Sequence, residues 1–121
     1  MEFMGRGRVK MTAVAKIRPE KRKEFLDAMR SLQDDKLKEK GVTASKWHED
    51  RQDPTRFNLI DEWETGEDLN RYCCSDSFRV FLGALKTLCI DAEVKYGSLD
   101  GEVQKEILAN FSSEDGGFGK M

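Results

Sequence analysis

The stretch RVKMTAVAKIR, residues 8–18, alternates apolar and polar side chains with a period of two. The side chains that share one face are Val9, Met11, Ala13, Ala15 and Ile17. This pattern predicts a half-buried β-strand. Pro19 follows directly, and a proline suits the first position of a helix because its missing N–H would be unpaired there anyway. The strand therefore leads straight into a helix that can cover its apolar face.

The helix after Pro19 is amphipathic, and Gly41 is predicted to end it. Its apolar stripe is Phe25, Leu26, Met29 and Leu32. Residues 42–50 form a weaker strand, in which Thr43, Ser45 and Trp47 lie on one side. Across the turn QDPT, the strand RFNLIDEWE completes a predicted hairpin.

Two short helical segments follow this hairpin, and each has a candidate N-cap. Thr65 with Asp68 three residues later resembles a capping box, and Ser75 resembles a second N-cap. The segment IDAEVKYGS then alternates as a fourth strand. After Asp100 we expect an amphipathic helix. Its apolar residues are Val103, Ile107, Leu108 and Phe111.

The order of elements is β-α-β-β-α-β with an added C-terminal helix, which is the ferredoxin-like α+β arrangement with a four-stranded antiparallel sheet. We expect one domain over residues 8–112, a tag-like or disordered stretch at 1–7 and a flexible tail at 113–121. Two helices can cover only one face of such a sheet. We therefore expect a homodimer that pairs the uncovered faces around a partly enclosed cavity.

Charge and composition exclude several classes of protein. The 121 residues include 21 basic and 23 acidic side chains, mixed along the chain for a net charge of −2, so no basic stripe suggests nucleic-acid binding. No apolar run approaches the about 18 residues of a membrane span, and no signal peptide is evident. We expect a cytoplasmic protein. One histidine and adjacent cysteines offer no usual metal-ligand spacing.

The cysteines agree with a reducing compartment. Cys73 and Cys74 are adjacent and Cys89 stands alone, which is neither a disulfide framework nor a CxxC motif. We interpret all three as reduced residues that pack on helices. A thiol switch at the adjacent pair is the alternative.

The chain resembles the antibiotic biosynthesis monooxygenase family of dimeric α/β barrels. The resemblance rests on VKMTAVAKIRPEKRKEFLDAM, GVTASKWHED, DPTRFNLIDEWET and DLNRYCCSDSF, and quinol monooxygenases are similar over the third stretch. It implies oxygenation of a small aromatic or quinol-type molecule without a cofactor. In such chemistry the substrate itself supplies electrons to O₂, inside a pocket that excludes water.

The chain departs from the family pattern at two positions. Many members carry a histidine where this chain has Tyr72. Members with established oxygenase chemistry place an asparagine four residues before the tryptophan, where this chain has Leu59. Asn58 lies one residue further back, so strand alternation predicts that Asn58 and Trp63 point to opposite faces.

The candidate catalytic residues are Asp61, Tyr72 and His48, and the candidate substrate-binding residues are Trp63, Trp47 and Asn58. Asp61 shares a strand face with Trp63 and suits a base or an orienting acceptor, or else it pairs with a lysine or arginine. Tyr72 suits a hydrogen-bond donor in place of the histidine, or an ordinary helix residue.

Each of the other candidate residues also has a purely structural interpretation. The tryptophans suit pocket walls or core anchors. His48 is the only histidine, the residue type that ordinarily titrates near neutral pH, and its alternative is a surface position. The alternative for the whole chain is a non-catalytic barrel that binds a small ligand or is a stress-related protein.

Overall fold

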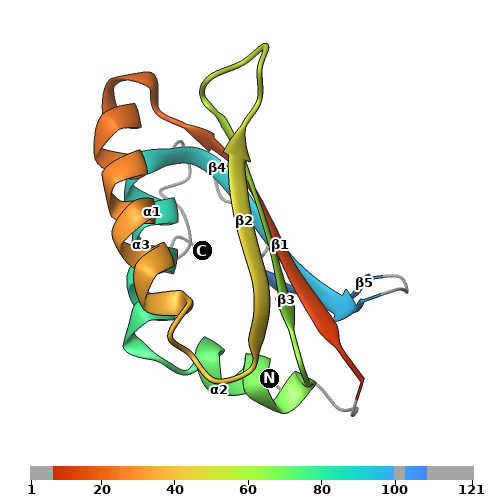
Figure 1. Cartoon of the computed structure of the whole chain (residues 1–121). Helices are drawn as coiled ribbons and strands as arrows, with labels where there is room; N and C mark the ends of the chain where they lie inside the picture. Colours follow the sequence, from red (N-terminus) through yellow and green to blue (C-terminus); the bar gives the residue numbers. More distant parts are fainter. Residues whose placement is uncertain (1–6, 100–102, 109–121) are drawn as a thin grey trace, which may run out of the picture.

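The structure is a computed structural model, and residues 7–99 and 103–108 are the part of the chain that it describes. Its elements follow the predicted order, with a short 3₁₀ turn before the first helix (Figure 1). They are β1 Val9–Ile17, η1 Pro19–Lys21, α1 Arg22–Lys36, β2 Val42–Glu49, β3 Arg56–Trp63, α2 Gly66–Cys73, α3 Asp76–Leu88, β4 Cys89–Ser98 and β5 Val103–Leu108.

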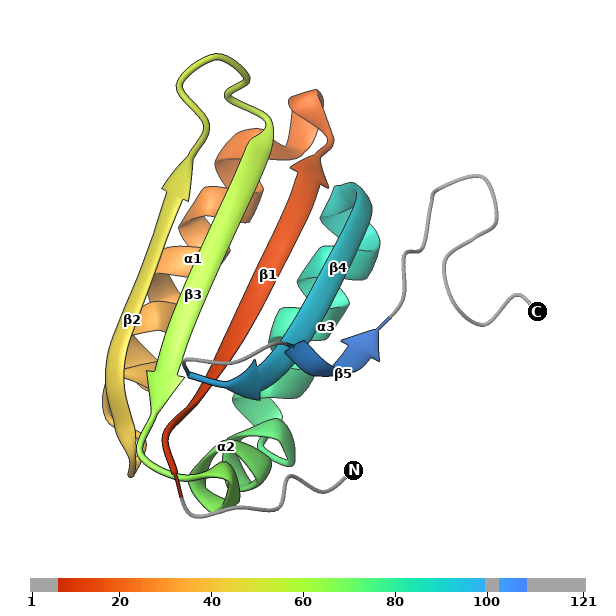
Figure 2. The ribbon, with the colours of Figure 1, turned by 90° about the vertical axis from the view of Figure 1, so that its right-hand side faces the viewer.

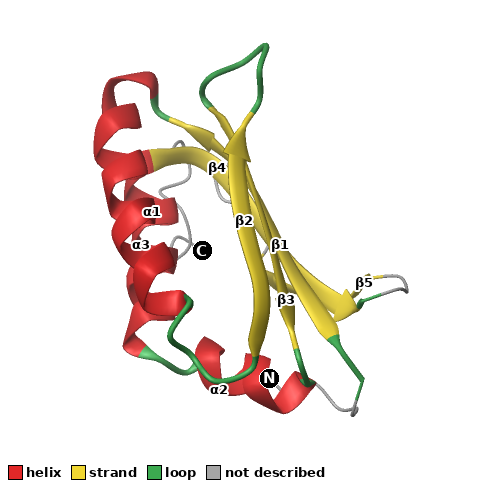
Figure 3. Ribbon diagram, viewed as in Figure 1, coloured by secondary structure: helices red, strands yellow, loops and turns green. Residues whose placement is uncertain are grey.

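The strands form one antiparallel sheet in the order β2-β3-β1-β4-β5. Helices α1 and α3 lie against one face of it, and the other face is uncovered by helices, as Figures 2 and 3 show from two sides. The predicted ferredoxin-like βαββαβ fold is confirmed. Helix α2 lies at the end of the sheet where β3 finishes (Figure 1).

The core fills the layer between the sheet and the helices. Every second residue of β1 points into this layer, and none of the five is more than 3% exposed. The α1 stripe predicted from helical spacing is buried as well. Burial of these side chains is the main favourable term in folding. On β1, β2 and β3 the uncovered face carries mainly polar side chains, with Val14 and Ile60 among its apolar residues.

Both predicted N-caps are present. The Thr65 hydroxyl accepts a hydrogen bond from the Asp68 backbone N–H at 3.1 Å, and the Ser75 hydroxyl accepts one from the Phe78 N–H at 3.1 Å. The Arg71 guanidinium donates to the Asp68 carboxylate and holds the pKa of that carboxyl below its ordinary value. These local bonds fix where α2 and α3 begin.

Two sequence predictions at element ends are wrong. Helix α1 ends at Lys36, and Gly41 follows it at a positive φ of 94° in the turn that enters β2. Residues 103–108 form strand β5 rather than a helix. Pairing with β5 supplies partners for β4 backbone groups that would otherwise lie on an open sheet edge.

Other parts of these predictions fall outside the described residues. They are Phe111, residues 1–6 and residues 113–121. Within residues 7–99 and 103–108, no helix is long and apolar enough to cross a membrane.

The turn at Gly41 gives a stability prediction. A Cβ at this residue would collide with the Asp68 carboxylate, and L side chains rarely adopt its φ. We expect Gly41→Ala to lower the free energy of unfolding by about 1–3 kcal/mol, measured by urea denaturation. Gly83→Ala is the matched control.

Gly83 lies on the exposed side of α3, where an added methyl group would meet only open space and the backbone φ is not positive. We expect Gly83→Ala to raise the free energy of unfolding by about 0.5–1 kcal/mol. An equal effect of the two substitutions would contradict the account of the Gly41 turn.

Candidate functional site

A charged pair lies inside the layer between α1 and the sheet. Lys36 is 3% exposed and Asp61 is 0% exposed. The Lys36 ammonium donates to both carboxylate oxygens, at 2.9 Å to Oδ2 and 3.2 Å to Oδ1. Burial of charge is costly unless the charges are paired and hydrogen-bonded, and here they are. The pair joins the last residue of α1 to β3, near the C-terminal end of that strand.

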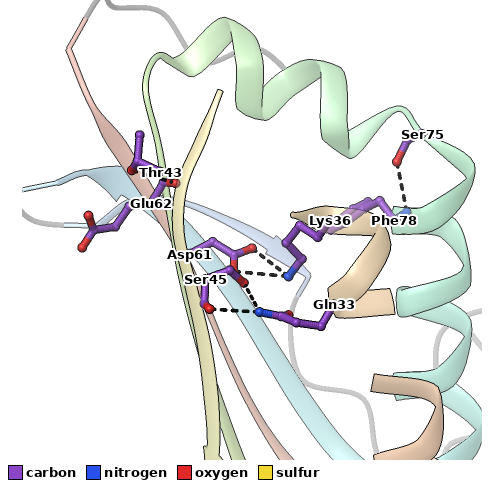
Figure 4. A network of polar contacts seen from close by, with 8 residues as sticks. All are labelled: Gln33, Lys36, Thr43, Ser45, Asp61, Glu62, Ser75 and Phe78. Carbon is purple, nitrogen blue, oxygen red and sulfur yellow. Dashed lines mark hydrogen bonds and ion pairs between the residues drawn. The ribbon is translucent and has the colours of Figure 1, made fainter. Parts of the chain in front are cut away.

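Two neutral side chains complete this polar network, as Figure 4 shows. The Ser45 hydroxyl donates to Asp61 Oδ1 at 2.5 Å. The Gln33 amide in turn donates to the carbonyl and the hydroxyl oxygen of Ser45, each at 2.9 Å. Three elements therefore meet at one carboxylate: α1, β2 and β3. Each group that contacts Asp61 in this network is a donor, as a carboxylate requires.

Aromatic rings surround the cation. The Trp63 and Tyr72 rings are stacked, with centroids 5.0 Å apart. The Lys36 Nζ atom lies 5.6 Å from the Tyr72 centroid and 5.8 Å from the Phe81 centroid, within the range of cation–π attraction. The Trp63 indole N–H is buried and has no hydrogen-bond partner among the described residues. An unpartnered buried donor is uncommon in a folded protein.

Burial sets the protonation of two nearby groups. It raises the pKa of the Tyr72 hydroxyl well above its ordinary range, and the Asp61 carboxylate adds to this shift. The Tyr72 hydroxyl therefore stays protonated at neutral pH and can act as a donor. Burial likewise raises the pKa of the Cys73 thiol to about 12, with Cys74 and Asp61 adding smaller contributions. A thiol held protonated is a weak nucleophile.

The structure divides the six predicted site residues between the two faces of the sheet. Asp61, Trp63 and Tyr72 lie together in the helix-covered layer. Trp47 also faces this layer, further along the sheet, with its ring centroid 5.5 Å from that of Phe57. The roles proposed for these residues stay predictions.

His48 and Asn58 are cross-strand neighbours on the uncovered face. The predicted opposition of Asn58 and Trp63 agrees with the strand alternation of the structure. His48 lines a shallow hollow of about 240 Å³ on that face. The other residues of this hollow are Ala44, Lys46, Ile60 and Glu62. The sheet separates it from the charged pair, so the six residues do not form one site.

Lys36 belongs to the site although it was not among the residues predicted from the sequence. Its burial could nevertheless have been predicted from the sequence, because Lys36 lies four residues after Leu32 and seven after Met29, on the apolar stripe of α1. A lysine on a buried stripe needs a partner. The sequence alone did not say which acidic residue would meet it.

The side chains that could bind a metal ion do not cluster in the part of the chain that the structure describes. All three cysteines are free, with Cys74 exposed, Cys73 half-buried and Cys89 buried. Among the residues that the structure describes, no group of three or more His, Cys, Asp or Glu side chains gathers as metal ligands.

Comparison with known proteins gives a family match and several similar folds. The family model described as antibiotic biosynthesis monooxygenase matches residues 8–84, a span that contains the charged pair and its aromatic neighbours. A conserved protein from Methanosarcina mazei is 22% identical with a TM-score of 0.71, and the match covers 77% of this chain and 93% of that one.

Two further solved structures are similar over comparable spans. An antibiotic biosynthesis monooxygenase is 23% identical with a TM-score of 0.69, covering 77% of this chain and 99% of its own. A protein from Shewanella oneidensis is 17% identical with a TM-score of 0.70, covering 78% and 93%. A search of curated proteins finds no match to this chain.

The buried pair gives a stability prediction. Lys36→Met leaves Asp61 as a buried charge without its ammonium, so we expect a loss of about 3–5 kcal/mol in the free energy of unfolding. Adding Asp61→Val replaces the pair by apolar side chains of similar total volume. Because both charges are then gone, we expect the double variant to recover most of the loss.

Urea denaturation of the wild type, both single variants and the double variant measures this coupling. Lys23→Met is the matched control, because the Lys23–Asp27 pair is exposed and its loss is expected to cost about 0–1 kcal/mol. Additive losses in the double variant would contradict a coupled buried pair.

Proposed function

Since the chain belongs to the antibiotic biosynthesis monooxygenase family, we propose that it oxygenates a small aromatic or quinol-type molecule without metal or flavin. The observation that carries the proposal is the Asp61 carboxylate, buried beside the Trp63–Tyr72 stack. A cofactor-free oxygenase needs a carboxylate or similar base in a place that is apolar, aromatic and closed to water.

The overall reaction balances without an external reductant. A reduced substrate AH₂ and O₂ give AO and H₂O, so one oxygen atom enters the product and the other leaves as water. The substrate supplies all four electrons. Its reactive form is the anion, because loss of a hydroxyl proton makes the ring electron-rich enough to reduce O₂. The protein therefore has to remove one proton and hold the ring in a dry site.

Each inward-facing candidate residue has a role in this reaction. Asp61 accepts the hydroxyl proton. Trp63 lies along the substrate ring and offers its unpartnered indole N–H to a substrate oxygen. Tyr72 stacks on Trp63 and keeps its own proton. Trp47 closes the layer further along the sheet. His48 and Asn58 lie on the uncovered face and take no part in the proposed reaction.

A non-catalytic ligand-binding barrel is the second candidate. It is favoured by the hydrogen bonds that Lys36 and Ser45 donate to the Asp61 oxygens, because these bonds already engage the carboxylate that the proposed reaction would use as its base. In that case the barrel binds a small aromatic molecule and no oxygen is consumed.

We also infer that two copies associate through the uncovered face of the sheet. Two apolar side chains at the centre of this face support the inference: Ile60 is 47% exposed and Val14 is 36% exposed. Helices cover the opposite face, so this is the face left for a second copy (Figure 2).

Oxygen consumption tests the proposed reaction. We expect metal-stripped protein to consume O₂ with a panel of quinols and anthrone-like phenols, in a reaction that needs protein and survives chelator. Trp63→Phe removes the indole donor, and we expect it to lower kcat/KM at least about tenfold, as loss of a buried hydrogen bond to a reacting molecule does.

Trp47→Phe is the control, since Trp47 is an aromatic residue of the same layer away from the Trp63–Tyr72 stack. Absence of O₂ uptake across the panel, together with measurable binding of the same compounds, would contradict the oxygenase and support the non-catalytic barrel. Equal effects of the two tryptophan variants would contradict the role of Trp63.

The association of two copies has its own test. Ile60→Lys places a charge at the centre of the uncovered face, next to Lys46 on the neighbouring strand, so we expect dimers to become monomers by light scattering. Val80→Lys is the matched control, because Val80 is 57% exposed on α3, away from the sheet. A monomeric wild type, or a dimer unaffected by Ile60→Lys, would contradict the inference.

A further inference from the structure

We propose that two copies pair through the uncovered face about a two-fold axis that follows an apolar diagonal across three strands. This inference rests on the association proposed above and adds to it the direction of the axis and the residues that meet. It starts from the described residues of the uncovered face, on which the exposed large apolar side chains are Val14 and Ile60. Figure 2 shows their strands, β1 and β3, side by side with β2 and β4.

The strand register places the apolar side chains on a diagonal. Residues paired across neighbouring strands point to the same face of the sheet. From β2 through β3 to β1, the register gives three successive rows on the uncovered face: Ala44–Glu62–Lys10, Lys46–Ile60–Thr12 and His48–Asn58–Val14. The apolar member moves one strand along at each row, so Ala44, Ile60 and Val14 form a line that crosses the sheet obliquely.

Opposite charges flank this diagonal at Ile60. Lys46 lies beside Ile60 on β2, on one side of the diagonal, and Glu62 lies two residues along β3, on the other side. All three side chains line the same hollow. Among the described residues, neither Lys46 nor Glu62 has a side-chain ion-pair partner. Each charge is therefore available to a partner from another molecule.

A two-fold axis along the diagonal brings these charges together. When two copies of one face meet about such an axis, residue i meets residue j of the second copy and j meets i. The axis exchanges the two sides of the diagonal, so Lys46 meets Glu62 of the second copy, and this contact occurs twice. Ile60 lies close to the axis and packs against Ile60 of the second copy, over the hollow.

The neighbouring polar side chains are complementary in the same arrangement. At the next step of the diagonal, Asn58 lies on one side and Thr12 on the other. The axis brings Asn58 opposite Thr12 of the second copy, where an amide and a hydroxyl can form a hydrogen bond. On β4 the diagonal reaches Asp91, whose charge would meet its own copy, so the match is confined to β1, β2 and β3.

Mixing two charge-reversed variants tests this pairing. In each variant alone, Lys46→Glu or Glu62→Lys, like charges meet at both contacts. We expect each to be monomeric by light scattering, with a dissociation constant at least about 100-fold above that of the wild type. An equimolar mixture of the two variants has opposite charges at both contacts, so we expect it to form dimers.

A double variant and a matched control exclude a general effect of net charge. Lys46→Glu/Glu62→Lys keeps the net charge of the wild type, and we expect it to dimerise with itself and to form no mixed dimer with the wild type by native mass spectrometry. Lys23→Glu makes the same charge change on an exposed part of α1, and we expect its dimers to be as stable as those of the wild type.

The results separate this inference from the proposals on which it rests. A monomeric wild type would overturn both the axis and the association itself. Single variants that dimerise like the wild type, a mixture that stays monomeric, or a double variant that pairs freely with the wild type would overturn the contact between Lys46 and Glu62. The loss of dimers in Ile60→Lys would then still assign the interface to the uncovered face, and O₂ uptake tests the proposed reaction independently.

Discussion

The ion pair between Lys36 and Asp61 connects the end of α1 to β3, and the organisation of the site depends on it. The two groups lie in a layer otherwise filled by apolar and aromatic side chains. Because neither charge is tolerated there alone, the pair fixes the end of α1 relative to β3, and Ser45 extends the constraint to β2. The aromatic rings of Trp63, Tyr72 and Phe81 are then held around a cation.

The one-sided cover of the sheet gives the molecule two distinct surfaces. Alternation along each strand sends Asp61 and Trp63 into the helix-covered layer and sends Asn58 and Ile60 to the uncovered face. The inner layer is buried and holds the charged pair and its aromatic neighbours. The outer face is free of helices and exposes Val14 and Ile60. A single strand, β3, contributes to both, so substitutions at adjacent positions of this strand test different properties.

The parts of the fold that depend on local pattern were predictable from the sequence. The alternation in β1 and the caps at Thr65 and Ser75 involve neighbours in the chain, and the structure agrees with each. The end of α1 and the strand at residues 103–108 were not predictable in this way. Pairing with β4 decided the second, and this tertiary contact outweighs the helical spacing of Val103 and Ile107.

The site, too, combines a feature set by local sequence pattern with a contact between residues far apart in the chain. The sequence placed Asp61 and Trp63 on one face and left open whether Asp61 acts as a base or pairs with a cation. The partner of Asp61 is a lysine 25 residues away in the chain, and that contact follows only from the packing of α1 on the sheet. A lysine on an apolar helix stripe is the signal that such a contact exists, although it does not identify the partner.

The most direct measurement is the rate of quinol-dependent O₂ uptake by the folded Lys36→Met/Asp61→Val double variant, compared with wild type at equal concentrations of folded protein. The central claim is that the charged pair takes part in the reaction, in addition to joining α1 to β3. We expect a cooperatively folded double variant without O₂ uptake, beside an active wild type. A folded double variant that consumes O₂ at the wild-type rate would contradict the claim.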